Sequence, residues 1–249
     1  MLAKVSQLGR DFLPADTRRR LKAVVDPLLA TVGSIQAARK ATSVVALTFD
    51  DGPDATVTPQ VLDLLRQAGA RATFFILSDH AERLPQIVRD IVAQGHEIGL
   101  HGDRHDRLTQ LSTSEVRSRL AVAKAAIETI SGKRITLFRP PYGAQTLATY
   151  IVAKSLGLQT VVWGPYAEDW LDSSPEAAAA KVLDVVRGGE IALFHDGLEL
   201  DDHAVRPALD RARVVELVLD GFKARGLTAD TVSAMIDESG ARKTGWFRT

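Results

Sequence analysis

The 249-residue sequence contains no cysteine. This absence excludes disulfide bonds, thiolate catalysis and cysteine-ligated zinc, but it leaves metal sites built from His and Asp open. A net charge is also missing, because 31 Lys and Arg balance 31 Asp and Glu. No overall field therefore attracts nucleic acid or another acidic polymer, and we expect no nucleic-acid partner.

Long hydrophobic runs are missing from the N-terminal region, which is basic. Residues 1–40 carry eight Lys and Arg against three Asp, and these charges interrupt every stretch that could form the core of a secretory signal. The longest uncharged run there, Pro27–Ala38, is too short and too polar for a transmembrane helix. We therefore predict a cytoplasmic protein.

An amphipathic helix is predicted within residues 1–42. Apolar residues recur there at helical spacing, namely Leu21, Val24, Val25, Leu28, Leu29 and Val32. Two interpretations stay open: the helix packs against the rest of the chain, or residues 1–40 make peripheral contact with a membrane. In both, the main domain comprises residues 43–249.

After residue 43, short apolar runs alternate with longer amphipathic segments, which is a βα rhythm. Most runs are continuously hydrophobic, as in parallel strands covered on both faces. The predicted strands are Val44–Phe49, Ala72–Leu77, Glu97–Leu100, Ile135–Phe138, Gln159–Trp163, Ile191–His195 and, more weakly, Leu227–Val232. The predicted helices are Thr58–Gln67, Ala81–Gln94, Thr113–Ile130, Leu147–Leu156, Pro175–Arg187 and Val205–Arg225. Six or seven βα units favour a closed or nearly closed, TIM-like (β/α) barrel of the α/β class, with a doubly wound open sheet as the alternative.

Reactive side chains follow the predicted strands. They are Asp50, Asp51, His101, His105, Arg139, Asp169 and His195. Because the carboxyl ends of the strands of a parallel barrel share one face, we expect these side chains to meet in one active site.

Three of these side chains suit a catalytic metal site. A cation would relieve the repulsion between the adjacent carboxylates of Asp50 and Asp51, which leaves one as a ligand and the other free for catalysis. His101 and His105 are four residues apart, so both imidazoles can reach one ion. With Asp51 they make three protein ligands and leave positions for water and substrate. Turn formation at Asp51-Gly52 and ordinary surface histidines are the structural alternatives.

The remaining strand ends suit proton transfer. His195 ends an apolar strand and can act as a general acid, with Asp169 holding its imidazole charged. Arg139 can orient Asp50, and the proline-stiffened turn after it can present a backbone N–H to an oxyanion. A core histidine, an exposed loop acid and plain turn architecture are the competing interpretations.

Taken together, these residues form five motifs in a fixed order. The motifs are Thr48–Pro53, His101–His105, Arg139–Tyr142, Asp169–Trp170 and Leu193–His195. Over residues 43–235 the chain resembles the polysaccharide deacetylases of the NodB-homology type, carbohydrate esterase family 4. The resemblance implies a distorted seven-stranded barrel, with residues 43–249 as the catalytic domain.

The resemblance also implies a role for each motif residue. Asp50 would be the catalytic base, His195 the acid, and Asp51, His101 and His105 the ligands of one divalent metal ion, with zinc as the default. The other motif residues would orient the acid and the base, hold the oxyanion or wall an acetyl pocket, namely Arg139, Asp169, Tyr142, Trp170 and Leu193.

Two positions depart from the family pattern. Gly102 stands where the family has Ser or Thr in the metal loop, and Tyr166 stands where it has the first acid of an Asp-x-x-Asp-Trp motif. The first departure concerns the rigidity of the metal loop, and the second concerns contact with the substrate.

The predicted function is metal-dependent removal of an N-acetyl group from an amino sugar in an oligosaccharide, polysaccharide or glycoconjugate. The alternatives are a deacylase of another amide, such as a formamido sugar or a cyclic imide, and a non-catalytic carbohydrate-binding relative. An iron oxygenase with a His-x-Asp…His triad beginning at His101 conflicts with the βα rhythm. The sequence leaves the sugar and the oligomeric state open.

Overall fold

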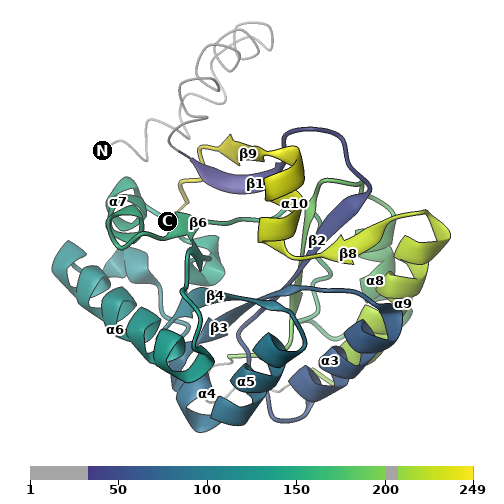
Figure 1. Cartoon of the computed structure of the whole chain (residues 1–249), viewed down its shortest axis with the longest axis horizontal. Coiled ribbons are helices and arrows are strands. Elements are labelled where there is room, and N and C mark those ends of the chain that lie inside the picture. The colour runs from purple at the N-terminus through teal and green to yellow at the C-terminus, as the bar shows by residue number, and fades with distance from the viewer. Residues whose placement is uncertain (1–32, 200–206, 249) are drawn as a thin grey trace, which may run out of the picture.

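The computed structural model describes residues 33–199 and 207–248. Seven parallel strands form its centre, in the order β6-β5-β4-β3-β2-β7, with β8 paired to β2 (Figure 1). They are β2 (Val44–Asp50), β3 (Thr73–Leu77), β4 (Glu97–Gly102), β5 (Leu137–Phe138), β6 (Gln159–Thr160), β7 (Ile191–His195) and β8 (Thr228–Asp230). All seven strand predictions are thus confirmed in position, although β5, β6 and β8 are shorter than predicted.

The sheet closes through the segment that follows β6. The backbone N–H of Gly164 donates to the carbonyl of Ile191 (2.9 Å), that of Leu193 to Pro165 (3.0 Å), and that of Ala167 to Leu193 (3.4 Å). These bonds join β7, at one edge of the sheet, to the chain that leaves β6 at the other edge. The predicted (β/α) barrel is therefore confirmed, and the open-sheet alternative is wrong.

Helices surround the barrel (Figure 1). They are α3 (Val57–Ala68), α4 (Ser78–Arg83), α5 (Pro85–Ala93), α6 (Thr113–Ser131), α7 (Leu147–Ser155), α8 (Pro175–Leu183), α9 (Arg211–Ala224) and α10 (Val232–Ser239), with short 3-10 turns at Leu108–Gln110 and Pro141–Gly143. The single helix predicted over 81–94 is two helices, because Pro85 occupies the first turn of α5 and its missing N–H ends the α4 ladder. Helix α10 was not predicted from the sequence. Among the described residues, no helix has both the length and the apolar character needed to cross a bilayer.

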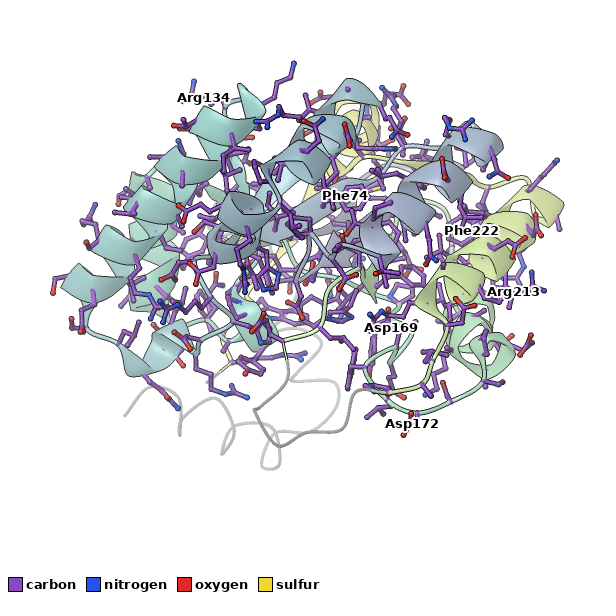
Figure 2. The ribbon with its side chains drawn as sticks, turned by 90° about the horizontal axis from the view of Figure 1, so that it is seen from below. Phe74, Arg134, Asp169, Asp172, Arg213 and Phe222 are labelled. Atoms are coloured by element: carbon purple, nitrogen blue, oxygen red, sulfur yellow. The ribbon has the colours of Figure 1, made fainter. Side chains whose placement is uncertain are left out.

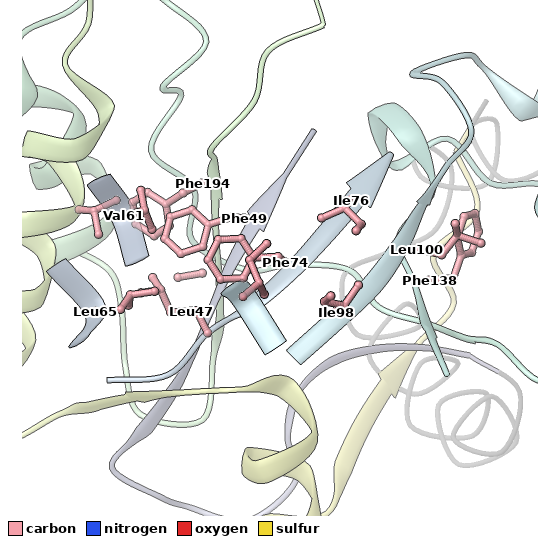
Figure 3. Close-up of a cluster of buried hydrophobic side chains, with 14 of the residues drawn as sticks. Leu47, Phe49, Val61, Leu65, Phe74, Ile76, Ile98, Leu100, Phe138 and Phe194 are labelled. Carbon is pink, nitrogen blue, oxygen red and sulfur yellow. The ribbon is translucent and has the colours of Figure 1, made fainter. Parts of the chain in front are cut away.

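Successive side chains of each strand point to opposite faces of the sheet, which creates two packing layers. Phe74 and Phe75 are neighbours on β3, yet Phe74 packs outside the barrel under the helices and Phe75 packs inside it. The outer layer is centred on stacked rings, with the Phe49 centroid 5.0 Å from that of Phe74 and 5.9 Å from that of Phe194 (Figure 3). Burial on both faces explains why these strands are continuously hydrophobic.

The chain before residue 43 differs from the prediction. Residues Ser34–Ala38 form β1, which pairs antiparallel with β9 (Ala241–Thr244), and buried Ile35 bridges to Val161 beside β6. Residues 34–38 are thus a strand of the folded body rather than part of a helical extension, and a boundary at residue 42 falls too late. The helix predicted around Leu21–Val32 lies outside the described residues.

Candidate active site

Two buried carboxylates lie where β2 ends. Asp51 has a φ of 69°, in the left-handed region that Asp tolerates better than most residues, so the chain turns sharply after Asp50. A Cβ atom at Gly52 would lie 2.2 Å from the Asp196 carboxylate, so only glycine fits there. The turn directs the two carboxylates to different partners.

Asp50 pairs with Arg139, as predicted. The Nη1 atom of this fully buried arginine donates to Asp50 Oδ1 (2.7 Å) and to Thr48 Oγ1 (2.9 Å). Burial lowers the pKa of Arg139, which the charge of Asp50 opposes. The guanidinium also lies over the Phe75 ring, 4.2 Å from its centroid. These contacts leave Asp50 a single orientation.

Asp51 faces His101 and His105. His101 Nδ1 donates to the Arg139 carbonyl (2.8 Å), and its Nε2 lies 3.2 Å from Asp51 Oδ1. His105 Nε2 lies 3.5 Å from the same oxygen. The three predicted ligand residues thus bring one ligand atom each within 4.8 Å of the others.

The protonation of this cluster suits a cation. Burial acts to raise the pKa of Asp51, but the neighbouring imidazoles of His101, His195 and His105 outweigh it and hold that pKa well below its usual range. Burial lowers the pKa of His105 to about 4, against the opposing charge of Asp51, so its imidazole is neutral. A carboxylate and two imidazole nitrogens that converge in a buried site are the donor set of a divalent metal with an open position.

His195 and Asp169 form a second pair at the same end of the barrel. Asp169 accepts hydrogen bonds from His195 Nδ1 and from the His195 backbone N–H, each at 2.8 Å. Burial acts to lower the pKa of His195, but the charge and hydrogen bond of Asp169, with the charges of Asp51 and Asp50, raise it to about 9. The imidazole is therefore a cation with a proton to give. Figure 2 shows Asp169 inside the body and Asp172 farther out on the loop that follows.

The walls of the site also contain the predicted residues. Tyr142, at φ 59°, places its ring 4.2 Å from that of His105, on the side of the ligand cluster. Trp170 presents its ring edge-on to His195 at 5.2 Å, and buried Leu193 precedes His195 by two residues on β7. Most of the reactive residues lie at or just after the carboxyl ends of β2, β4, β5 and β7, whereas Asp169 and Trp170 belong to the long loop after β6 and Leu193 precedes the end of β7.

The backbone conformation at position 102 favours glycine. Its φ is 125°, which strongly favours glycine, and a Cβ atom there would lie 3.2 Å from the Arg104 carbonyl oxygen. The loop is fixed from outside instead, because Asp103 binds Arg119 of α6 (2.8 Å) and Arg104 binds Asp79 of α4 (2.8 Å). Two ion pairs thus link this loop to α6 and α4.

Sequence reasoning missed Asp196. This fully buried carboxyl accepts a hydrogen bond from Thr58 Oγ1 (2.6 Å), and that hydroxyl accepts one from the Asp54 backbone N–H (2.7 Å). Burial raises the pKa of Asp196 to about 7. Asp196 thereby ties β7 to the turn after β2. The sequence contained a signal for Asp196. An acid directly follows the last residue of a strand both at Asp50-Asp51 and at His195-Asp196.

Comparison with known proteins agrees with this geometry. The sequence profile of the family described as Polysaccharide deacetylase matches residues 37–161. A peptidoglycan-N-acetylglucosamine deacetylase from Bacillus cereus is 36% identical over 198 residues, which cover 78% of this chain and 88% of that protein. The chain belongs to the polysaccharide deacetylase family. Its relatives named as deacetylases are hydrolases of carbon–nitrogen bonds other than peptide bonds, and the chain is an enzyme of this deacetylase type.

Other members of the polysaccharide deacetylase family extend the comparison. A chitooligosaccharide deacetylase from Azorhizobium caulinodans is 37% identical over 164 residues, which cover 66% of this chain and 78% of that protein. A family 4 acetyl xylan esterase from Clostridium thermocellum, solved in complex with a cobalt ion, is 30% identical with a TM-score of 0.69. That alignment covers 78% of this chain and 91% of the esterase.

Proposed function

We propose that this protein removes an N-acetyl group from an amino sugar of an oligosaccharide or polysaccharide, with Asp50 as base, His195 as acid and one divalent metal ion. The observation that carries the proposal is the shared location of three groups: the Asp50–Arg139 pair, the Asp51–His101–His105 cluster and the Asp169–His195 pair all lie at one barrel end. An acid, a base and a metal site are the three components of metal-assisted amide hydrolysis.

The ligand cluster supports a catalytic metal rather than a structural one. Three protein ligands leave coordination positions for other molecules. When bound by Asp51, His101 and His105, a divalent metal supplies a Lewis acid that polarises the amide carbonyl and lowers the pKa of water. Two imidazoles and one carboxylate favour zinc, and the related esterase was solved with cobalt, another divalent ion.

Proton transfer is divided between the two pairs. Arg139 holds Asp50 through Oδ1, so the second oxygen of Asp50 is the proposed acceptor of the proton from the attacking water. His195 carries a proton on Nε2, because Nδ1 is engaged by Asp169, and it protonates the departing sugar nitrogen. The acid thus starts in the state that the reaction requires.

The walls of the site account for the acyl group. Trp170 and Leu193 lie beside His195 and are the proposed apolar contacts of a small acyl methyl. The backbone N–H of Tyr142 is the proposed donor to the oxyanion. Apolar contacts of this kind favour acetyl over a charged acyl group.

Relatives suggest where the sugar comes from. The Bacillus relative is named for peptidoglycan N-acetylglucosamine and the Azorhizobium relative for chitooligosaccharides. Mass-spectrometric screening of zinc-loaded protein on both classes, with formamido sugars and cyclic imides added, should show loss of an acetyl mass from N-acetylglucosamine polymers. Turnover only on the formamido or cyclic compounds would replace the proposal with that alternative. Absence of any turnover would favour a non-catalytic relative.

A further inference from the structure

Residues Gly245–Arg248, which we call the C-terminal tail, lie against the turn that carries Tyr142. The backbone of Arg248 pairs with that of Gln145 through two hydrogen bonds, of 2.7 and 3.0 Å. The buried side-chain amide of Gln145 also donates to the Trp246 carbonyl (2.7 Å). Trp246 is itself buried. The C-terminal tail is therefore a fixed part of the folded body.

The indole of Trp246 begins a chain of hydrogen bonds that ends at Tyr142. Its Nε1 atom donates to the Gly143 carbonyl (3.0 Å). The N–H of the same peptide group, which belongs to Ala144, donates to the Pro141 carbonyl (3.0 Å). That carbonyl shares a trans peptide group with the N–H of Tyr142, so the two point in opposite directions. A side chain of the C-terminal tail thus sets the orientation of the proposed oxyanion donor through two peptide groups.

Ring packing holds the same turn. Gly143 has a φ of 62°, and a Cβ atom there would lie 2.7 Å from the Trp163 ring and 3.4 Å from Trp246 Nε1. Glycine therefore lets the two indole rings, whose centroids are 5.3 Å apart, pack against the turn. The Trp163 ring centroid also lies 5.7 Å from the guanidinium carbon of Arg139, which holds Asp50. The two rings thus support both the turn and the arginine of the proposed base.

We propose that Trp246 is a positioning residue for the deacetylation reaction, and that it acts by holding the Tyr142 N–H towards the oxyanion. Each hydrogen bond in a chain of peptide groups polarises the next, so donation from the indole also strengthens the N–H at the far end of the chain. A donor that is oriented in advance costs no reorganisation when the oxyanion forms. This inference rests on the proposed function, because it takes Tyr142 as the oxyanion donor.

The chemistry of tryptophan suits this role. Its Nε1 atom is a donor and never an acceptor, so a carbonyl such as that of Gly143 is a suitable partner. The guanidinium carbon of Arg248 lies 3.8 Å from the centroid of the Trp246 ring, in a cation–π contact that also holds the indole in place. A phenyl ring preserves contacts of this kind but lacks the N–H. Substitution can therefore separate the hydrogen bond from the packing.

The test compares steady-state kinetics of the zinc-loaded wild type and Trp246→Phe on chitotetraose. The variant should lower kcat by about tenfold, less than the loss of an oxyanion donor itself. KM should stay within about threefold of the wild type, because the donor acts on the transition state. The alkaline limb of the kcat profile should not move, since His195 is unchanged. Phe247→Leu, which alters the neighbouring exposed side chain, is the matched control and should leave kcat as it is.

A second variant keeps the test valid if Trp246→Phe does not fold. Replacement of Trp246 by benzothienylalanine, in which sulfur takes the place of the N–H, preserves the size of the ring and removes only the donor. This protein should show the same fall in kcat with an unchanged KM.

Amide exchange followed by NMR tests the anchoring without turnover. The amides of Gly143 and Ala144 should exchange about fivefold faster in Trp246→Phe, the factor for one lost hydrogen bond, and at the wild-type rate in Phe247→Leu. Unchanged exchange, or an unchanged kcat in Trp246→Phe, would overturn the inference and leave the proposed function standing. A wild type that deacetylates no N-acetylated sugar would instead overturn the proposed function, and with it the role of Trp246 in the reaction.

Discussion

At the scale of single residues, the charge of His195 is set by one neighbour. Asp169 engages both the ring and the backbone of His195, and its carboxylate leads the effects that raise the pKa of that imidazole to about 9 against burial. A general acid must be protonated, so activity should persist at a pH where an ordinary histidine, with a pKa near 6.5, has already lost its proton.

Asp169→Asn should therefore move the alkaline limb of the kcat profile towards lower pH. The amide keeps the shape of the side chain but removes the negative charge that favours the imidazolium, so the proton of His195 leaves at a lower pH, by at least about one unit. Measuring kcat across pH for wild type and variant tests this. Asp172→Asn, three residues along on an exposed part of the same loop, should leave the limb in place. An unmoved limb in Asp169→Asn would assign that ionisation to another group.

Substitutions of His101 and of Asp50 should separate metal binding from turnover. His101→Ala should lose bound metal and activity together, because it removes one of three converging ligand atoms. Asp50→Asn should keep the metal and lower turnover by roughly two to four orders of magnitude, since Asp50 is committed to Arg139. Elemental analysis with parallel activity assays gives both quantities. His80→Ala, whose imidazole pairs with Glu199, is the matched control and should keep its metal. Full metal occupancy in His101→Ala would refute the ligand assignment.

At the scale of elements, the proposed metal loop depends on the backbone conformation of Gly102. Gly102→Ser adds a hydroxyl there, but at φ 125° and with a close approach to Arg104 we expect it to destabilise the fold by about 1–3 kcal/mol and to weaken metal binding. Urea unfolding and zinc titration measure the two effects. Gly132→Ser is a suitable comparison, because that glycine has a φ of 64° with open space around it. Its cost should be smaller, about 1 kcal/mol. Tighter zinc binding by Gly102→Ser would mean that the loop rearranges.

Several elements could be predicted from sequence because burial on both faces leaves a direct pattern. The run Val44–Phe49 is apolar except for Thr48 and is followed directly by Asp50, and the apolar run Ile191–Phe194 is followed directly by His195. Strand β1 has only five residues and finds its partner near the other end of the chain, so no local pattern marks it. Likewise, Gly164–Ala167 closes the barrel through backbone bonds, which side-chain patterns do not report.

The residues of the candidate site also divide into those that local sequence predicts and those whose contacts depend on the fold. Its metal and acid–base residues are local to strand ends, and their chemistry is visible in the residue types. The contact of Asp196 with Thr58 joins positions 138 residues apart, and the parallel rings of Tyr166 and Trp170 depend on the left-handed turn at Glu168. Contacts of these kinds become visible only when the chain is folded.

At the scale of the whole molecule, the folded body begins before residue 43. A protein lacking residues 1–32 should fold and deacetylate soluble oligosaccharide, whereas one lacking residues 1–40 should lose on the order of 3 kcal/mol or more of unfolding free energy. The second truncation removes β1, its pairing with β9 and the fully buried Ile35. Thermal and urea unfolding of the two proteins test this. Equal stability would show that β1 is dispensable.

The shorter truncation also tests the predicted membrane contact. If residues 1–32 contact a membrane, the intact chain should sediment with anionic vesicles at low ionic strength, where screening is weakest, and the protein lacking residues 1–32 should not. An intact protein that stays in the supernatant would leave only the packing interpretation of the N-terminal stripe.

The segment that closes the barrel, Gly164–Ala167, affects how an enzyme of this fold can change its ligand preference. Closure there depends on main-chain groups of Gly164, Pro165 and Ala167, to which the side chain of residue 166 contributes nothing. A mutation at residue 166 can therefore alter what the site accepts without loosening the barrel that positions the acid. Ligand preference can therefore change at residue 166 while the architecture and the reaction stay the same.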